Sequence, residues 1–334
     1  MDRFPLTLTL TLRLRLRGAT SAFALFLLVA ASSASAQVYP AKPIKLVQGF
    51  GAGGNGDTTA RILAQGMSQG LGQPIVVEGR TGAGGNIASE FVAKSPADGY
   101  TLVLLTGGHA VSGGLYKSLP FDPVNDFAMV SAVTFFPFVI SVRADHPAKT
   151  LADFLAMAKK APGTLKYSSV GIGSTQHLAG ELLASSAGVE LTHVPYRGGG
   201  APVEGLLRGD VDIMIDTVTF TAAQIKGGRI RALAVTNPAP WPALPGVPTV
   251  AETVPGYEVR SWTGLAAPKG TPADIVDRLN AEARRALALP EIKNRFEELG
   301  NEVRPTSSNE LKIHVATEIA KWKRVVEQAK IERQ

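Results

Sequence analysis

The chain has no cysteine among its 334 residues. It therefore forms no disulfide bond and no cysteine-ligated zinc site, and no lipid-bearing cysteine follows an export signal. Long apolar runs are scarce as well. The most apolar stretch, residues 19–31, is shorter than the roughly 20 residues that a membrane-spanning helix needs.

Familiar catalytic motifs are also missing. None of the five histidines stands in H-E-x-x-H, there is no G-x-S-x-G elbow, and no Gly-Lys-Ser/Thr completes a Walker A loop. We therefore expect no catalysis, no metal site and no cofactor, although a Ser-His-Asp triad dispersed along the chain stays open. The net charge of +6 is shared between residues 1–36 and the rest, which is too weak to indicate nucleic-acid binding.

Residues 1–36 have the pattern of a signal peptide. Arginines precede the apolar stretch at 19–31, and Ala34-Ser35-Ala36 supplies the small residues that signal peptidase requires. We predict cleavage after Ala36, which leaves a periplasmic protein without a lipid anchor. A membrane anchor is the alternative, and the short apolar run disfavours it.

After residue 36, β-branched runs alternate with helical patterns. This alternation is typical of an α/β protein with mainly parallel sheets. The predicted strands are residues 44–48, 74–78, 101–105, 138–143, 165–170, 192–194, 212–215, 231–236 and 261–267. The predicted helices are residues 57–70, 86–95, 151–160, 175–187, 201–208, 272–287, 291–299 and 309–329. Five prolines in residues 237–248 predict an ordered segment that is neither helix nor strand.

Four glycine-rich loops each follow a predicted strand and precede a predicted helix. They are residues 49–58, 81–86, 170–175 and 196–200. Glycine lets a ligand approach the backbone closely, and the next helix begins with unpaired N–H groups at the positive end of its dipole. Such loops bind anions, and two in each half of the chain would face one another across a cleft. For any single loop, a tight turn is the alternative explanation.

The first loop also matches the dinucleotide pattern G-x-G-x-x-G at Gly49, Gly51 and Gly54, and Glu78 ends the next predicted strand. A nicotinamide-dependent oxidoreductase is therefore an alternative. The predicted export disfavours it, because that cofactor is not normally available outside the cytoplasm.

Four charged or titratable side chains lie near these loops. Asp57 either caps the first helix or orients loop N–H groups and a bound water. Asp216 ends an apolar strand, where it either caps the following loop or accepts a hydrogen bond from a ligand. Arg197 pairs with a ligand carboxylate or with a surface acid. His177, one turn into a helix, faces the cleft or packs within the protein.

The order of several motifs resembles the Bug-type extracytoplasmic receptors of tripartite tricarboxylate transporters. These motifs are Gly53–Arg61, Gly82–Ala88, Asp98–Leu102, His177–Glu181, His193–Gly199, Arg231–Thr236 and Pro248–Glu252. The resemblance implies a two-lobed type II periplasmic-binding fold that closes on its ligand. Residues 37–137 and 237–334 would form lobe 1, and residues 138–236 would form lobe 2. The chain would then cross between the lobes near Pro137 and Asn237.

The resemblance also implies the function and the site. We expect a monomeric receptor that delivers a small carboxylate (a di- or tricarboxylate, an acidic amino acid or an aromatic acid) to membrane transporter subunits. An exported sensor module with a signalling partner is the alternative. The candidate ligand-binding residues are Gly53, Gly54, Asn55, Asp57, Thr58, Gly84, Gly85, Asn86, Gly173, Ser174, His177, Arg197 and Asp216.

Overall fold

The computed structural model describes residues 39–334, so the predicted leader at residues 1–36 lies outside the described residues. Residues 42–334 form one compact unit, and residues 39–41 lie outside it. Among the described residues, no helix combines the length and the apolar character that crossing a membrane requires.

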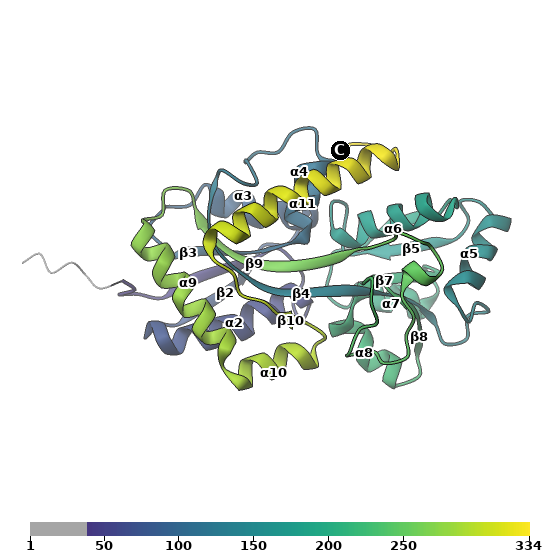
Figure 1. Ribbon diagram of the computed structural model, residues 1–334, viewed down its shortest axis with the longest axis horizontal. Coiled ribbons are helices and arrows are strands. Elements are labelled where there is room, and N and C mark those ends of the chain that lie inside the picture. The colour runs from purple at the N-terminus through teal and green to yellow at the C-terminus, as the bar shows by residue number, and fades with distance from the viewer. Residues whose placement is uncertain (1–38) are drawn as a thin grey trace, which may run out of the picture. The chain divides into compact units, whose positions relative to one another are not determined.

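The strands of residues 42–334 join into one sheet of ten strands (Figure 1). They are β1 (Ile44–Gln48), β2 (Ile75–Gly79), β3 (Thr101–Thr106), β4 (Phe127–Arg143), β5 (Lys166–Ser169), β6 (Thr192–Pro195), β7 (Ile213–Thr217), β8 (Ile230–Val235), β9 (Arg260–Pro268) and β10 (Glu302–Val303). The first region of the sheet holds β1, β2 and β3, which pair parallel, with β9, β4 and β10 added antiparallel. The second region holds β5, β6 and β7, which pair parallel, with β4 joining β7 and β8 antiparallel.

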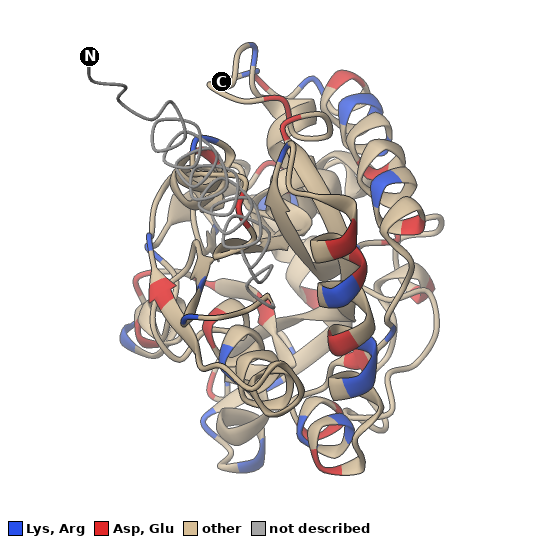
Figure 2. Cartoon of the chain, turned by 90° about the vertical axis from the view of Figure 1, so that its left-hand side faces the viewer, with Lys and Arg blue, Asp and Glu red and all other residues tan. Residues whose placement is uncertain are grey.

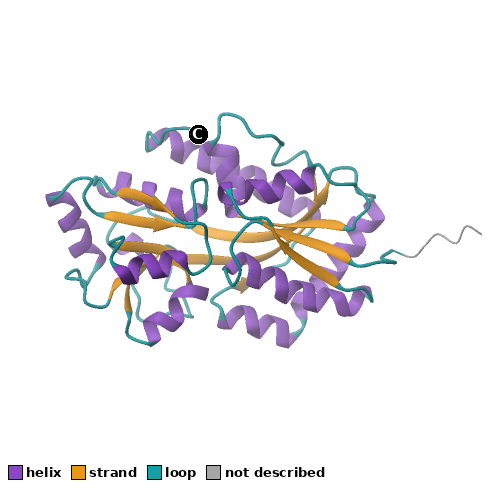
Figure 3. Cartoon of the chain, turned by 180° about the vertical axis from the view of Figure 1, so that it is seen from behind, coloured by secondary structure: helices purple, strands orange, loops and turns teal. Residues whose placement is uncertain are grey.

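Helices cover both faces of these strands, as Figure 3 shows from behind. They are α2 (Asn55–Leu71), α3 (Asn86–Ala93), α4 (Gly107–Leu115), α5 (Leu151–Lys160), α6 (Thr175–Ala187), α7 (Ala201–Arg208), α8 (Val218–Lys226), α9 (Ala273–Ala288), α10 (Pro290–Glu298) and α11 (Ser308–Gln328), with 3-10 turns η1 (Ala83–Gly85) and η2 (Val250–Glu252). The long helix α11 packs against α4 and β4, and α2 packs against α9. The α/β alternation predicted from the sequence is therefore present.

Strand β4 belongs to both regions of the sheet. Residues up to Pro137 pair with β9, and residues from Phe138 onward pair with β7 and β8. Figure 1 shows β4 and β9 running side by side through the middle of the fold. The change of partner coincides with the predicted first crossing, while the division into two lobes at Pro137 and Asn237 stays a prediction.

Thr236 connects the segments that pass between the two regions. Its side chain is fully buried. The hydroxyl donates a hydrogen bond to the Val259 carbonyl (2.7 Å) and accepts one from the Phe138 amide (2.8 Å). Because a buried amide or carbonyl without a partner destabilises a fold, this one hydroxyl satisfies two backbone groups at once.

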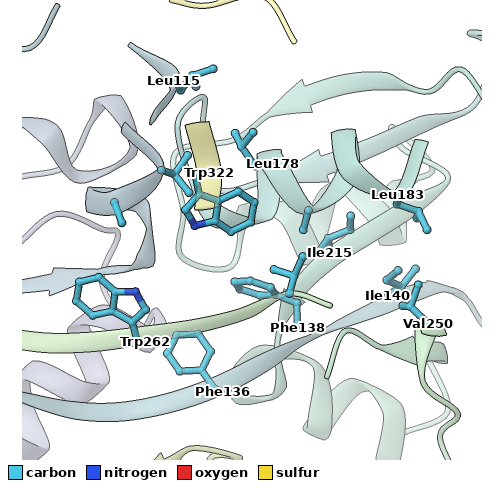
Figure 4. Close-up of a cluster of buried hydrophobic side chains, with 14 of the residues drawn as sticks. Leu115, Phe136, Phe138, Ile140, Leu178, Leu183, Ile215, Val250, Trp262 and Trp322 are labelled. Carbon is cyan, nitrogen blue, oxygen red and sulfur yellow. The ribbon is translucent and has the colours of Figure 1, made fainter. Parts of the chain in front are cut away.

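One hydrophobic core is continuous through both regions. It extends from Val47 on β1 through Phe136 and Phe138 on β4 to Ile213 on β7. Figure 4 shows Phe136 beside Trp262, whose indole is fully buried, and the rings of Phe136 and Phe138 lie 5.9 Å apart. Burial of apolar surface is the main force that favours folding, so β4 connects the regions by packing as well as by hydrogen bonds.

Figure 2 shows positions of Lys and Arg interspersed with positions of Asp and Glu along the ribbon. The ion pairs among the described residues include Lys45 with Glu78 and Lys94 with Glu90. Exposed pairs of this kind contribute about 0–1 kcal/mol each, so they have little influence on the fold.

Two helices, the first part of β4 and the short strand β10 are absent from the sequence-based prediction. The helices are α4 and α8, and the missing segment of β4 is residues 127–137. Most other elements differ from the prediction by one or two residues at their ends, and β1, α5, α6 and α7 have the predicted bounds.

Candidate functional site

A cavity of about 40 Å³ lies between the two regions of the sheet. The first turns or cap residues of four helices line it. These are Gly54, Asn55 and Gly56 at α2, Thr106 and Gly108 at α4, Thr175 and Gln176 at α6, and Thr217 at α8. Gly198 and Gly199, in the loop before α7, complete this side.

Three of these helices begin without a side-chain cap. The N-cap residues are Gly54 for α2, Thr106 for α4 and Thr217 for α8, and none of their side chains accepts a hydrogen bond from the helix. Helix α6 differs, because Ser174 Oγ accepts from the His177 amide at 3.2 Å. Uncapped helix starts present free N–H groups and the positive end of the helix dipole. The cavity is therefore suited to an anion.

The rest of the cavity wall is mainly apolar. Four phenylalanines line it: Phe50, Phe136, Phe138 and Phe220. Among the described residues, no lysine, arginine or histidine lines the cavity, and Asp216 is its one ionisable side chain. A carboxylate bound here would be held by backbone N–H groups and not by an ion pair.

Asp216 lies at the end of β7 and is only 1% exposed. Its Oδ1 accepts a hydrogen bond from the Thr217 amide at 2.7 Å, whereas Oδ2 has no hydrogen-bond partner among the described residues. Burial raises the pKa of this carboxyl to about 7, although Thr217 and the nearby Gln176 side chain moderate the rise. Burial disfavours the charged form. Because buried polar atoms in native proteins almost always have a hydrogen-bond partner, the free Oδ2 is suited to a hydrogen bond with a ligand.

Two glycine contacts join the regions beside the cavity. A Cβ atom at Gly51 would lie 3.0 Å from the Gly199 nitrogen, and one at Gly84 would lie 2.9 Å from the Gly173 carbonyl carbon. Each contact joins a loop of the first sheet region to a loop of the second. The absence of side chains at these positions lets the loops approach this closely.

In the first loop, Asp57 organises the backbone. Its carboxylate accepts hydrogen bonds from the Gly53 amide (3.0 Å), Gln48 Nε2 (3.2 Å) and Arg61 Nε (3.0 Å). Burial raises its pKa, but the bonds from Arg61, Gly53 and Gln48 outweigh burial and lower the pKa overall. Thr58 Oγ1 donates to the Gly53 carbonyl. Gly53, Asp57 and Thr58 are not among the cavity-lining residues.

Asn55 lines the cavity, but its side chain is bonded elsewhere. The Oδ1 atom accepts from Thr219 Oγ1 (2.9 Å) and from Asn301 Nδ2 (3.0 Å). Because Thr219 belongs to α8, this contact ties the first loop to the second region of the sheet.

The second loop lies beside the cavity and does not line it. Gly84 lines a neighbouring surface groove together with the exposed Arg197. The Gly85 amide donates to the Gly82 carbonyl at 2.9 Å. Asn86 is buried, and its Oδ1 has no hydrogen-bond partner among the described residues.

The third loop places His177 away from the cavity wall. Its ring stacks on His193 with centroids 4.2 Å apart, and Gly173 contacts the second loop. Burial lowers the pKa of His177 to about 4 and that of His193 to about 3. The structure thus shows His177 in a packing contact outside the cavity wall.

A family model described as the tripartite tricarboxylate transporter family receptor matches residues 59–331. The chain belongs to this receptor family. It is 40% identical over 290 residues to the "UPF0065 protein in tcbD-tcbE intergenic region" of Pseudomonas sp. (strain P51), which covers 86% of each chain.

Solved structures of similar proteins agree with this membership. The periplasmic binding protein BugD has a TM-score of 0.85 at 35% identity, covering 89% of this chain and 100% of its own. The protein Rpa4515 of R. palustris, solved with adipate, has a TM-score of 0.85 at 38% identity, covering 88% and 99%. The predicted Bug-type receptor family and the periplasmic-binding fold are therefore confirmed.

The family is one of solute receptors and not of nicotinamide enzymes. Glu78, the acid that follows the G-x-G-x-x-G match at the end of the next predicted strand, is paired with Lys45 at 2.8 Å and Arg80 at 2.7 Å. These partners lower the pKa of Glu78 by donating hydrogen bonds, Lys45 most strongly. The G-x-G-x-x-G match therefore belongs to the first loop of a receptor.

Several of the residues that line the cavity were not predicted from the sequence. Thr106-Gly107-Gly108 is a fifth glycine-containing junction between a strand and a helix, and that signal was available. Thr217 follows Asp216 directly and could have been found with it. Phe136, Phe138 and Ser261 come from β4 and β9. No local pattern marks a residue of a strand as facing a distant helix start.

Proposed function

We propose that this receptor captures a small organic carboxylate in the cavity and delivers it to the membrane subunits of a transporter, with no bond made or broken. The observation that supports a carboxylate is the meeting of four helix starts, three of them uncapped, at a cavity that no basic side chain among the described residues lines. Adipate, found in the structure of Rpa4515, is a carboxylate of this general kind.

The proposed movement is closure of two lobes, residues 37–137 with 237–334 and residues 138–236. The change of partner along β4 at Pro137 supports a hinge there. The contacts of Gly51 with Gly199 and of Gly84 with Gly173 join the two proposed lobes, so opening of the lobes would separate these pairs.

We propose Gly54, Asn55 and Asp216 as direct ligand contacts, because they line the cavity. The remaining candidates would shape the loops around it. They are Gly53, Asp57, Thr58, Gly84, Gly85, Asn86, Gly173, Ser174 and His177, with Arg197 at the neighbouring groove. The protein would act as a periplasmic monomer after removal of residues 1–36, which fractionation of cells expressing the full chain and amino-terminal sequencing would test.

A thermal-shift screen tests the ligand class. Mono-, di- and tricarboxylates, amino acids and NADH are each added to the purified mature protein. A ligand at a hundredfold excess over its Kd stabilises the folded state by about 2.7 kcal/mol. We expect at least one carboxylate to raise the Tm. If NADH raises it and no carboxylate does, the receptor proposal is wrong.

The variant Gly54→Val tests the site. A Cβ atom at Gly54 would lie 3.0 Å from the Gly51 carbonyl oxygen and 3.7 Å from Phe220 Cε2, so the larger side chain obstructs the cavity. We expect the ligand response to vanish while thermal unfolding stays cooperative. Gly200→Ala, where a Cβ atom meets nothing within 4 Å, is the matched control. Unchanged affinity in Gly54→Val would remove the first loop from the site.

A further inference from the structure

The cavity proposed to bind an anion has an acidic side chain in its wall. Its one ionisable lining side chain among the described residues is the acid Asp216. A ligand that carried carboxylates alone would place a negative charge near this buried carboxyl, and like charges at close range are unfavourable. The helix starts can bind the carboxylate at one end of a ligand. Asp216 would need a hydrogen-bond donor or a positive charge at the other end.

The orientation of Asp216 defines that requirement. Thr217 occupies Oδ1 through its amide at 2.7 Å, and Oδ2 has no partner among the described residues. The side chain is 1% exposed, so bulk water does not solvate it. Buried polar atoms in native proteins almost always have a hydrogen-bond partner, and the cavity is the space from which one can come.

No neighbouring charge substitutes for such a partner. The charged or titratable residues on the elements packed against β7 are Arg143 on β4, Lys166 and Tyr167 on β5, His177 and Glu181 on α6, Glu204 and Arg208 on α7, and Lys226 on α8. None of them contributes to the pKa shift of Asp216, which arises from burial and from Thr217 and Gln176. A positive charge on the ligand would therefore be the first to face this carboxylate.

We infer that the ligand carries an ammonium group beside its carboxylate, and that Asp216 selects for it. This inference rests on the proposed function and narrows its ligand class to amino acids and similar zwitterions. The carboxylate faces the uncapped starts of α2, α4 and α8, the ammonium donates to Asp216 Oδ2, and the apolar remainder contacts the phenylalanines. A hydrogen bond between two charged groups is stronger than one between neutral groups.

Matched pairs of compounds test the inference by isothermal titration calorimetry. The pairs are propionate with alanine, 3-methylbutanoate with valine, and succinate with aspartate, which differ only by the ammonium group. In at least one pair we expect the amino member to bind the wild-type protein about tenfold more tightly or better at pH 8. Ethylamine, which lacks the carboxylate of alanine, should not bind.

The variant Asp216→Asn supplies the second arm. Asparagine keeps the shape of the side chain and the acceptor for the Thr217 amide, but it lacks the charge, so the preference within the pair should fall to about threefold or less. Glu181→Gln is the matched control, since Glu181 bonds Tyr167 outside the cavity wall, and the preference should persist there.

The pH dependence of the wild-type protein is a third arm, and it does not depend on a variant that folds. Affinity for the amino member should rise between about pH 6 and 8, because Asp216, with a pKa of about 7, loses its proton over that range. If the unsubstituted acids bind as tightly as their amino partners at pH 8, or if the amino members bind more tightly as the pH falls, the inference is overturned while the proposed function stands. If no carboxylate or amino acid binds, the proposed function itself is wrong.

Discussion

The backbone of Gly51 lies so close to Gly199 that a β-carbon on Gly51 would stand 3.0 Å from the Gly199 nitrogen. The two residues are 148 positions apart in the numbering of the chain and come from loops that follow β1 and β6. Their contact lies beside the cavity, so its geometry should be coupled to ligand affinity.

Gly51→Val should weaken ligand binding by about tenfold or more, because the side chain keeps the two loops apart and the binding geometry forms less often. The affinity for the strongest ligand of the thermal-shift screen, determined by calorimetry, checks this. Gly200→Val is the control, since that position has open space, and its affinity should match the wild type. Equal affinities in all three proteins would show that the loop contact is not needed for binding.

Asp216 should make the unliganded protein less stable as the pH rises. The folded-state pKa is raised to about 7 from a usual value of 3.8, so its stability contribution is fully present below about pH 3.8 and is lost as the pH rises through 7. Relative to Asp216→Asn, the wild type should lose on the order of 4 kcal/mol between those limits. Urea unfolding at several pH values measures the difference.

A parallel series with Asp145→Asn serves as the control for Asp216, because the Asp145 side chain is 74% exposed. That variant should follow the wild-type pH curve. A wild-type curve that coincides with the Asp216→Asn curve would mean that the carboxyl is solvated in the folded protein.

The stacked rings of His177 and His193 should make the protein less stable as the pH falls, which is opposite to the effect of Asp216. Burial lowers their pKa values to about 4 and about 3, so both are neutral in the folded protein. Their contribution is present above about pH 6.5 and is lost as the pH falls through these lowered values. His193→Gln should therefore reduce the loss of stability between about pH 7 and 4 by roughly 2 kcal/mol or more. Parallel slopes for the two proteins would contradict the assignment.

Local signals account for the parts of the fold that could be predicted. Helix α6 has the predicted bounds because Ser174 caps its start and Gly188 ends it in the left-handed conformation. Helix α5 begins at a capping box formed by Thr150 and Asp153. In both helices the capping residues lie next to the helix in the sequence or within its first turn, so the boundaries could be predicted.

The missed elements depend on distant contacts. Helix α4 contains Gly107, Gly108, Gly113 and Gly114, which have poor helix propensity. A Cβ atom at Gly114 would lie 2.7 Å from the Lys323 nitrogen, so these glycines permit close packing against α11. The first part of β4 was missed because it ends at Pro137, and proline disfavours a strand prediction. Here Pro137 stands where β4 exchanges one partner for another.

The candidate site was predicted only in part, because local patterns can be recognised in the sequence and distant contacts cannot. The glycine loops and Asp216 were recognised because a strand end followed by a helix start is a local pattern. The orientation of His177 toward His193 depends on a strand 16 positions further along the numbering, and no local pattern reports it.

The hydroxyl of Thr236 has a mechanical consequence. It joins the amide of Phe138 to the carbonyl of Val259, so in the proposed lobe movement the chain segments at these residues would stay fixed to one another. Widening of the cavity would then proceed as rotation about that point, since one segment cannot slide along the other without breaking both bonds. Residues next to Thr236 would move least. The glycine-rich loops, which lie farther from Thr236, would move the greatest distance.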